Sequence, residues 1–331
     1  MFDLDQLRLL QTVGRTGSYS AAGRQLGYTQ PAVTYQMRNL ERQVGAPIAV
    51  RVGRTMRLTP AGEALLGHAE RIGALVRAAQ QDMAALVGQQ AGIVRLAAFP
   101  SSCATLVPQA IVAMSRLFPA VDVRLTQAEP PEARDLVRRG EVDLALCYHY
   151  AESAFQRPEP PSTSNPLERI HVLTEEVRLV LPVGHPAARQ SLIGIEQLAH
   201  DSFIIASAQF QDMLRRAASE AGFAPRITMV ADDYVAMQAL VGHGLGIALI
   251  PSLALTAHRN ERVIPLTLRG WPRRHVGIEV WPDVLRVQAV RTLTDVLRAP
   301  AHGPGTERVL GIPSPDEAVG DPRGEHKPDP E

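Results

Sequence analysis

The sequence has few of the residues that build disulfide scaffolds, metal sites or membrane spans. Its two cysteines, Cys103 and Cys147, form no C-x-x-C pair, which excludes a disulfide framework and a zinc ribbon and favours a reducing compartment. The longest apolar runs, such as 247–251, fall far short of the roughly 20 residues that span a bilayer. The N-terminus has neither the basic start nor the apolar segment of a signal peptide. We therefore expect a cytoplasmic protein with no membrane partner.

Motifs for catalysis and cofactor binding are also missing. The sequence contains no H-E-x-x-H, no G-x-S-x-G and no metal-spaced cluster among its 10 histidines. Gly242-x-Gly244-x-Gly246 resembles a dinucleotide loop but lies between a helix and the following strand, whereas a phosphate loop needs the strand first. We expect no enzyme, no cofactor and no metal site.

Positive charge is concentrated at one end of a chain whose net charge is +0. Residues 1–60 hold 8 arginines against the three acids Asp3, Asp5 and Glu41, which gives 8 − 3 = +5. A basic end on a neutral body indicates a polyanionic partner for that end and a separate role for the body.

Capping residues and apolar spacing predict three short helices in this basic end. They begin after Asp3, Ser18 and Thr29, and glycines end the first two. The second and third helices, joined by a tight turn, are typical of a helix-turn-helix, although any small three-helix bundle is an alternative. Residues 48–59 read as a β-hairpin that turns at Gly53 and carries three arginines, as a wing lying along phosphates would.

Residues 60–89 form one long helical pattern. Apolar or small residues recur there with alternating spacings of four and three, which is a heptad seam. The seam consists of Leu65, Ala69, Ile72, Val76, Ala79, Met83 and Leu86. We interpret it as a dimerising linker helix, and the alternative is a core helix of a globular domain.

The remaining chain alternates strands and helices, which predicts an α/β fold on parallel, doubly wound sheets. Strands are expected near 92–99, 121–126, 144–148, 172–181, 203–206, 227–230, 247–250 and 276–280, and helices near 101–118, 131–139, 209–221, 233–242 and 284–298. We expect two lobes, the first from about 90–160 and 268–299 and the second from about 161–267. Residues 300–331 are acidic and rich in proline, and we expect them to be disordered.

Five blocks of the N-terminal region carry a resemblance to a known family. They are Ser18–Ala22, Gln25–Leu26, Thr29–Thr34, Leu40–Glu41, and Arg51 and Arg54 followed by Leu58–Gly62. In their joint spacing they resemble LysR-type transcriptional regulators, and the resemblance extends to about residue 299. It implies a winged helix-turn-helix, a dimerising linker helix and a two-lobed effector domain like a periplasmic binding protein. Ala49 and Tyr35 depart from the family, where these positions are usually aromatic and often basic, respectively.

The resemblance and the helix pattern together nominate DNA-binding residues. Gln30, Thr34 and Tyr35 are expected at base edges, and Arg38, Arg51 and Arg54 at phosphates. Pro31, in the first turn of the same helix, is also expected among the DNA-binding residues. The expected partner is double-stranded DNA, bound by a homodimer or homotetramer.

Effector-binding residues are nominated where strands end and helices begin. Ser101 and Ser102 follow the first strand of the body, and their alternative role is helix capping. Gln127, Ala206 and Ser207 follow other strands and are further candidates. Amides and hydroxyls at such ends favour a small effector that is anionic or forms strong hydrogen bonds. No ring of aromatic residues flanks the two serines, which argues against a large planar ligand.

These expectations define a LysR-type DNA-binding transcriptional regulator controlled by a small molecule. The alternative is a cytosolic two-lobed small-molecule-binding protein or enzyme whose N-terminal helices only mediate assembly. The arginine-rich wing argues against that alternative.

Overall fold

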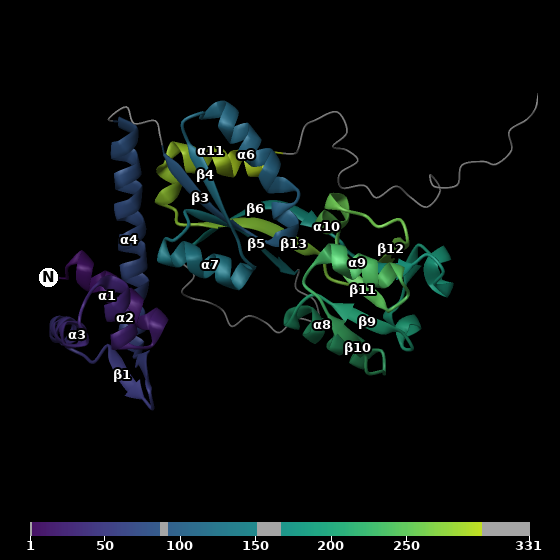
Figure 1. Cartoon of the computed structure of the whole chain (residues 1–331), viewed down its shortest axis with the longest axis horizontal. Coiled ribbons are helices and arrows are strands. Elements are labelled where there is room, and N and C mark those ends of the chain that lie inside the picture. The colour runs from purple at the N-terminus through teal and green to yellow at the C-terminus, as the bar shows by residue number, and fades with distance from the viewer. Residues whose placement is uncertain (1, 87–91, 151–166, 300–331) are drawn as a thin grey trace, which may run out of the picture.

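A computed structural model describes residues 2–86, 92–150 and 167–299. Three parts follow one another along the chain: a small helical head, the long helix α4, and two α/β lobes (Figure 1). The expected tail, residues 300–331, lies outside the described residues, as do the last residues of the expected linker. No helix in the described part of the chain is long and apolar enough to cross a membrane.

The head has the three predicted helices and the predicted hairpin. Its elements are α1 (Leu4–Thr16), α2 (Tyr19–Leu26), α3 (Gln30–Val44), β1 (Ala49–Val52) and β2 (Thr55–Leu58). The side chains of Asp3, Ser18 and Thr29 each accept a hydrogen bond from the first turn of the helix that follows. The hairpin turns at Gly53, whose φ of 62° suits glycine.

Helix α4 (Pro60–Leu86) belongs to two cores. Leu65 and Ala69 are buried in the core of the head, whereas Ala74 and Ala78 are buried in the core of the first lobe. The helix starts very close to the head, because a Cβ at Gly62 would lie 2.0 Å from the carbonyl oxygen of Ile48. Helix α4 therefore joins the head to the lobe through its own packed residues.

Lobe I is built on a five-stranded sheet with the order β4-β3-β5-β13-β6. Its strands are β3 (Ile93–Ala98), β4 (Asp122–Gln127), β5 (Leu144–Tyr150), β6 (Glu168–Glu175) and β13 (Arg274–Val280), and its helices are α5 (Pro100–Cys103), α6 (Leu106–Leu117), α7 (Pro130–Arg139), η3 (Val284–Arg286) and α11 (Gln288–Arg298). Helices α6 and α11 pack together on one side of the sheet and α7 covers part of the other (Figure 1).

Lobe II is built on a six-stranded sheet with the order β10-β9-β11-β7-β12-β8. Its strands are β7 (Val177–Pro182), β8 (Leu192–Ile193), β9 (Ser202–Ile205), β10 (Arg226–Val230), β11 (Ile247–Pro251) and β12 (Val263–Leu268). Its helices are η1 (Pro186–Arg189), η2 (Ile195–Leu198), α8 (Ala208–Glu220), α9 (Tyr234–Gly242) and α10 (Ser252–Ala257). Each lobe has its own buried apolar core.

The sheets are mixed, which corrects the expectation of parallel sheets. Strand β13 runs antiparallel to β5 and β6, and β7 runs antiparallel to β11 and β12. The predicted strand near 172–181 is two strands, β6 and β7, which belong to different lobes. The chain therefore enters lobe II at Glu176 and not near residue 161, and it returns to lobe I between β12 and β13.

The predicted helix 101–118 is also two helices, α5 and α6. The break lies at Thr105, whose φ of −129° and ψ of −73° are not helical. Pro108 explains the break, because its ring would clash with the carbonyl of Ala104 and it has no N–H to donate.

Candidate DNA-binding surface and effector site

The predicted base-contacting residues lie on the exposed side of α3. Gln30, Pro31 and Arg38 are exposed, and the Tyr35 side chain is 62% exposed. Thr34 is half-buried, and its hydroxyl donates to the carbonyl of Gln30 at 3.0 Å. Spacings of three and four residues place these side chains on one face, opposite the buried residues of the same helix. That polar face is available to a partner.

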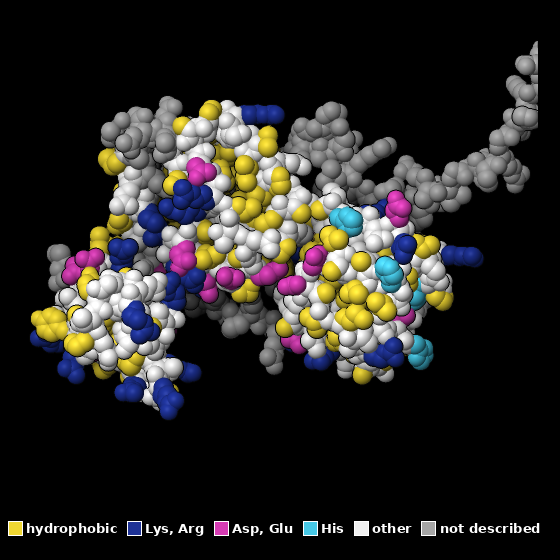
Figure 2. All heavy atoms as spheres, viewed as in Figure 1, with side chains coloured by type: hydrophobic (Ala, Val, Ile, Leu, Met, Phe, Trp, Pro, Cys, Tyr) yellow, Lys and Arg dark blue, Asp and Glu magenta, His cyan; other side chains and the backbone are white. Residues whose placement is uncertain are grey.

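The wing places further arginines on the head. Arg51 and Arg54 are exposed on either side of the turn at Gly53, and Arg51 Nε donates to the Gly53 carbonyl at 3.2 Å. Arginine side chains gather around the hairpin at the bottom of the head (Figure 2). The basic charge found in the sequence is thus presented by the hairpin together with α3.

The seven residues of the predicted seam do not share one environment. Leu65 and Ala69 are buried within the head, and Ile72 packs against the same cluster. These three residues pack inside their own chain, as the alternative of a core helix predicts, because the heptad stripe begins where α4 covers the head. Val76 is half-buried, while Ala79 is exposed and Met83 is 55% exposed. The side chain of Leu86 lies outside the described residues.

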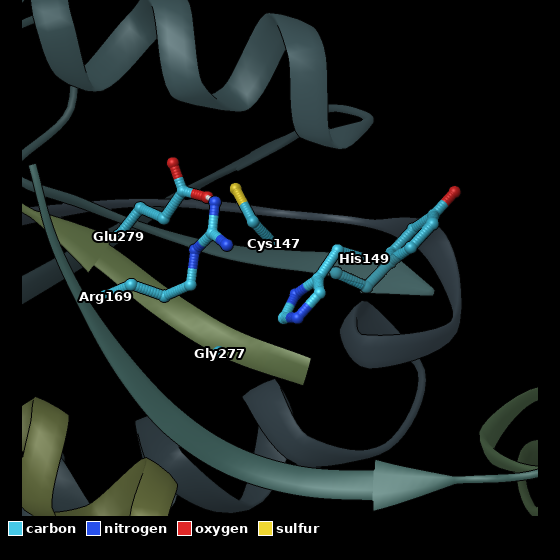
Figure 3. Close-up of a pocket in the computed structure, with 6 residues that line it drawn as sticks. Cys147, His149, Arg169, Gly277 and Glu279 are labelled. Atoms are coloured by element: carbon cyan, nitrogen blue, oxygen red, sulfur yellow. Dashed lines mark hydrogen bonds and ion pairs between the residues drawn. The ribbon is translucent and has the colours of Figure 1, made fainter. Parts of the chain in front are cut away.

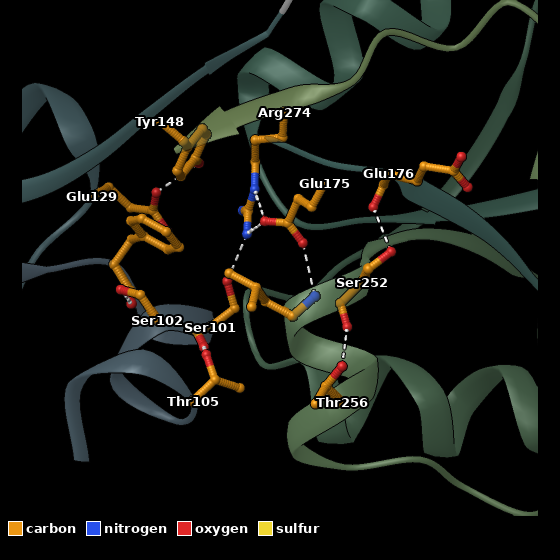
Figure 4. Close-up of polar contacts among 12 residues, drawn as sticks. Ser101, Ser102, Thr105, Glu129, Tyr148, Glu175, Glu176, Ser252, Thr256 and Arg274 are labelled. Carbon is orange, nitrogen blue, oxygen red and sulfur yellow. Dashed lines mark hydrogen bonds and ion pairs between the residues drawn. The ribbon is translucent and has the colours of Figure 1, made fainter. Parts of the chain in front are cut away.

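A buried ion pair occupies the junction between the lobes (Figure 4). Arg274 Nε donates to Glu175 Oε1 at 2.7 Å, and both side chains are almost fully buried. Glu175 Oε2 accepts from the backbone N–H of Leu253 at 2.7 Å, at the start of α10. The pair therefore links strands of lobe I to a helix of lobe II. Burial alone would lower the pKa of Arg274, but the adjacent Glu175 charge raises it, so the guanidinium stays charged.

The two candidate serines are part of this junction and are already hydrogen-bonded. Ser101 Oγ accepts from Arg274 Nη2 at 2.8 Å, and Ser102 Oγ donates to the carbonyl of Phe99 at 2.7 Å (Figure 4). Both serines are buried. In this structure both hydroxyls therefore bind groups of the protein itself.

The other candidate residues lie at strand ends as predicted. Gln127 is the exposed last residue of β4. Ser207 caps α8 and accepts from the backbone N–H of Phe210 at 3.3 Å, and Ala206 beside it is half-buried.

Aromatic residues surround the junction, which the sequence did not reveal. The Arg274 guanidinium lies 4.8 Å from the Phe99 ring centre and 4.5 Å from that of Tyr148. Tyr148 packs edge-on against Tyr150, and Tyr150 packs edge-on against Phe210. The sequence argument against a large planar ligand therefore fails, because these rings come from three separate elements and meet only in the folded chain. Tyr148 and Tyr150 at the end of β5 were the sequence feature that could have indicated aromatic residues at this site.

A second feature is a small pocket in lobe I where α7 meets the sheet, lined by Cys147, Tyr148, His149, Arg169, Gly277 and Glu279 (Figure 3). Glu279 is buried and accepts from Arg134 Nε at 2.6 Å and from Arg169 Nη2 at 3.2 Å. Burial would raise the pKa of Glu279, but the two arginines lower it below its usual value. These ion pairs tie α7 and β6 to β13.

Neither cysteine has the environment of a reactive thiolate. Burial raises the pKa of Cys147 to about 12 and also raises that of Cys103. Cys103 Sγ donates to the carbonyl of Ala98 at 3.3 Å. Among the described residues no group of three His, Cys, Asp or Glu side chains could hold a metal ion.

Comparisons with known proteins agree with this architecture. Residues 4–63 match the family described as bacterial regulatory helix-turn-helix protein, lysR family, and residues 88–301 match the LysR substrate binding domain. A probable RuBisCO transcriptional regulator of Emiliania huxleyi is 30% identical over 298 residues, which are 88% of each chain. The transcriptional dual regulator GltC of Bacillus subtilis is 29% identical over 83% of this chain and 90% of its own.

A solved structure has the same fold. A full-length OxyR variant of Pseudomonas aeruginosa aligns with a TM-score of 0.63 and 21% identity, and the alignment covers 95% of this chain and 99% of that one. The chain belongs to the LysR family of bacterial helix-turn-helix regulatory proteins. It is a transcriptional regulator that combines a DNA-binding domain with an effector-binding domain, and the family is one of regulators and not of enzymes.

Proposed function

We propose that the head reads DNA with α3 in the major groove and the wing along the backbone. Gln30, Thr34 and Tyr35 approach base edges, while Arg38, Arg51 and Arg54 contact phosphates. The observation that carries this assignment is the exposed polar face of α3 beside an arginine-bearing hairpin on the same small domain. We place this activity in the cytoplasm, where bacterial DNA lies.

The protein acts as a homodimer or homotetramer whose subunits meet along α4. Because Leu65 and Ala69 are used within the head, the contact falls on the later part of the seam, at Val76, Ala79, Met83 and Leu86. Leu75, which is also exposed on α4, adds apolar surface to the same half of the helix. Pairing of two such helices fixes the distance between two heads, and hence between DNA half-sites.

The effector is a small, anionic molecule that binds between the lobes. Gln127, Ala206 and Ser207 are expected near it, and Ser101 and Ser102, at the same junction, are expected to supply further polar contacts. The effector controls DNA binding by favouring one arrangement of the subunits over another.

The head assignment is tested by the salt dependence of DNA affinity. Each lost phosphate contact lowers the slope of log affinity against log salt by about one unit, so Arg51→Ala and Arg54→Ala each flatten it. Arg116→Ala is the matched control, because Arg116 is exposed on α6 in lobe I, far from the head in the fold. Gln30→Ala changes base preference without flattening the slope.

If the Arg51→Ala and Arg54→Ala variants keep the wild-type DNA affinity and salt slope, the wing does not contact DNA. A wild-type protein that binds neither DNA nor heparin in a salt-reversible manner would favour the alternative in which the head only mediates assembly.

A further inference from the structure

The side chain of Arg77 on α4 packs against the backbone of lobe I at Gly140. A Cβ added to Gly140 would overlap the guanidinium carbon and Nη2 of Arg77, so the guanidinium occupies the space that a side chain would fill. Gly140 ends α7 with a φ of 65°, and its N–H donates to the carbonyl of Val137 at 2.9 Å. Glycine at this position therefore allows both the left-handed turn and the close approach of Arg77.

The charge of Arg77 suits its position at the end of α7. The last carbonyls of a helix carry partial negative charge, which attracts a guanidinium. Arg77 also interacts electrostatically with Asp143, which is buried at the start of β5. Arg77 itself is half-buried, and this burial lowers the pKa of its guanidinium while Asp143 opposes the effect. The contact is therefore a directed one in a partly desolvated place.

The same guanidinium also lies close to the head. Nη1 of Arg77 is 3.3 Å, and Nε2 of Gln11 is 3.7 Å, from the point where a Cβ on Gly73 would lie. Gln11 belongs to α1, the head helix that packs along α4. Arg77 thus stands where the head, the linker helix and lobe I meet.

Other contacts between α4 and lobe I are less directed. Ala74 and Ala78 are buried in the lobe I core, but their side chains are single methyl groups that permit the helix to turn or slide. Arg71 forms an ion pair with Asp283, in which Nε and Oδ2 are 3.9 Å apart and the arginine side chain is 62% exposed. Arg77 adds the partly buried, directed contact that these residues do not provide.

Helix α7 also reaches the junction between the lobes. It begins after Glu129, whose Oε2 accepts from the Tyr148 hydroxyl at 2.7 Å, and the Tyr148 ring centre lies 4.5 Å from the Arg274 guanidinium. Arg134 in the middle of α7 is ion-paired with Glu279 of the sheet, with Nε and Oε2 2.6 Å apart. One helix thus contacts the lobe junction at its start and the linker helix at its end.

We propose that Arg77 is a positioning residue that holds the DNA-binding head in one orientation relative to α7, through the packing of its guanidinium on Gly140. The contact makes α7 the element that connects the lobe junction to the head. The proposal deepens the proposed function and rests on it, because it names the contact that couples the lobes to the head they regulate.

The first test is a double-variant cycle that uses two glycines. Gly140→Ala adds a methyl group that overlaps Arg77 and also strains the backbone, whereas Gly222→Ala, at a φ of 83° with open space around it, adds only the strain. In urea unfolding we expect Gly140→Ala to destabilise the Arg77→Ala variant less than it destabilises wild type, while Gly222→Ala destabilises both equally. If Gly140→Ala has the same effect in both backgrounds, Arg77 does not pack on Gly140 and the proposal is wrong.

The second test measures the orientation of the head, which a contact that only adds stability would leave unchanged. Spin labels on Arg24→Cys in the head and Glu132→Cys on α7, both at exposed positions, report the distance between head and α7 in the full-length protein. Cys103→Ser and Cys147→Ser remove the other thiols. An excess of unlabelled protein suppresses distances between subunits, and pulsed electron paramagnetic resonance gives the distance distribution.

We expect a narrow distribution in wild type and one about twice as wide or wider in Arg77→Ala and in Gly140→Ala, because the head then samples several orientations. Arg71→Ala and Gly222→Ala are the controls and are expected to keep the wild-type width. Equal widths in wild type and Arg77→Ala would overturn the proposal. Neither test uses DNA, so a failure of DNA binding would contradict the proposed function without changing these readouts.

Discussion

Arg15 in the head forms an ion pair with Glu141 of lobe I, with Nη1 and Oε1 3.1 Å apart. Glu141 also accepts from Arg139 Nε at 2.8 Å, so one carboxylate joins α1 to the end of α7. Both partners are partly exposed, and ion pairs of this kind contribute little to stability. Ala74 of α4 is fully buried in the lobe I core. Apolar packing through α4 is therefore expected to dominate the position of the head.

This balance predicts different results for two substitutions. Glu141→Gln is expected to change the free energy of unfolding by less than about 1 kcal/mol and to leave the solution scattering profile unchanged. Ala74→Asp places a charge in the lobe I core and is expected to cost about 2 kcal/mol or more and to alter the profile. If the scattering profile changes with Glu141→Gln and not with Ala74→Asp, the ion pair and not the apolar packing sets the position of the head.

The Arg274–Glu175 pair predicts strong non-additivity. Arg274→Ala leaves Glu175 buried without its counter-charge and is expected to lower the free energy of unfolding by about 3–5 kcal/mol. The double variant Arg274→Met/Glu175→Leu removes both charges and fills a similar volume, so it is expected to be more stable than Arg274→Ala. Denaturant unfolding of the single and double variants measures the difference. A double variant that is less stable than Arg274→Ala would contradict this account of the pair.

The later half of α4 predicts the oligomeric state. Met83→Asp places a charge on an exposed position of the proposed contact and is expected to shift the protein toward monomers in sedimentation, with little loss of stability in the head. Leu65→Ala is the control, because Leu65 is buried in the head and its truncation acts on stability. If Leu65→Ala dissociates the oligomer and Met83→Asp does not, the subunits meet along the earlier half of α4 instead.

The head could be predicted from the sequence because its signals are local. Asp3, Ser18 and Thr29 cap helices only a few residues away, and the turn at Gly53 joins adjacent strands. The nominated DNA-binding residues of α3 follow from helix periodicity, which is why their place on its exposed face agrees with the prediction.

The junction between the lobes could not be predicted in the same way. Ser101 is hydrogen-bonded to Arg274, which lies 173 residues further along the chain, and no local pattern relates the two. The ends of β3, β4 and β9, which carry the candidate residues, were located to within one residue, but which side chains fill the space between them depends on tertiary packing. The heptad seam shows a related limit, because an apolar stripe does not tell whether Leu65 faces its own chain or a second one.

The contact between α4 and α7 predicts a pH dependence of stability. Glu70 on α4 is half-buried, and this burial raises its pKa from 4.5 to about 7. The charged groups that act on it are Arg138, Asp135, Arg139 and Glu63, of which the two arginines lower the pKa and the two acids raise it. The folded protein thus holds a proton on Glu70 in a range where the unfolded chain has lost it.

The sign of the effect follows from proton binding. Between pH 4.5 and about 7 the folded state binds more protons than the unfolded state at this residue, so its contribution to stability falls as pH rises. Glu70→Gln keeps a neutral side chain at every pH, and we expect it to flatten the decline between about pH 5 and 8. Urea unfolding across this range measures the effect, and Glu220→Gln, at an exposed position at the end of α8 in lobe II, is the control. Parallel curves for wild type and Glu70→Gln would mean that Glu70 ionises in the folded protein as readily as in the unfolded chain, and that burial against α7 does not hold its proton.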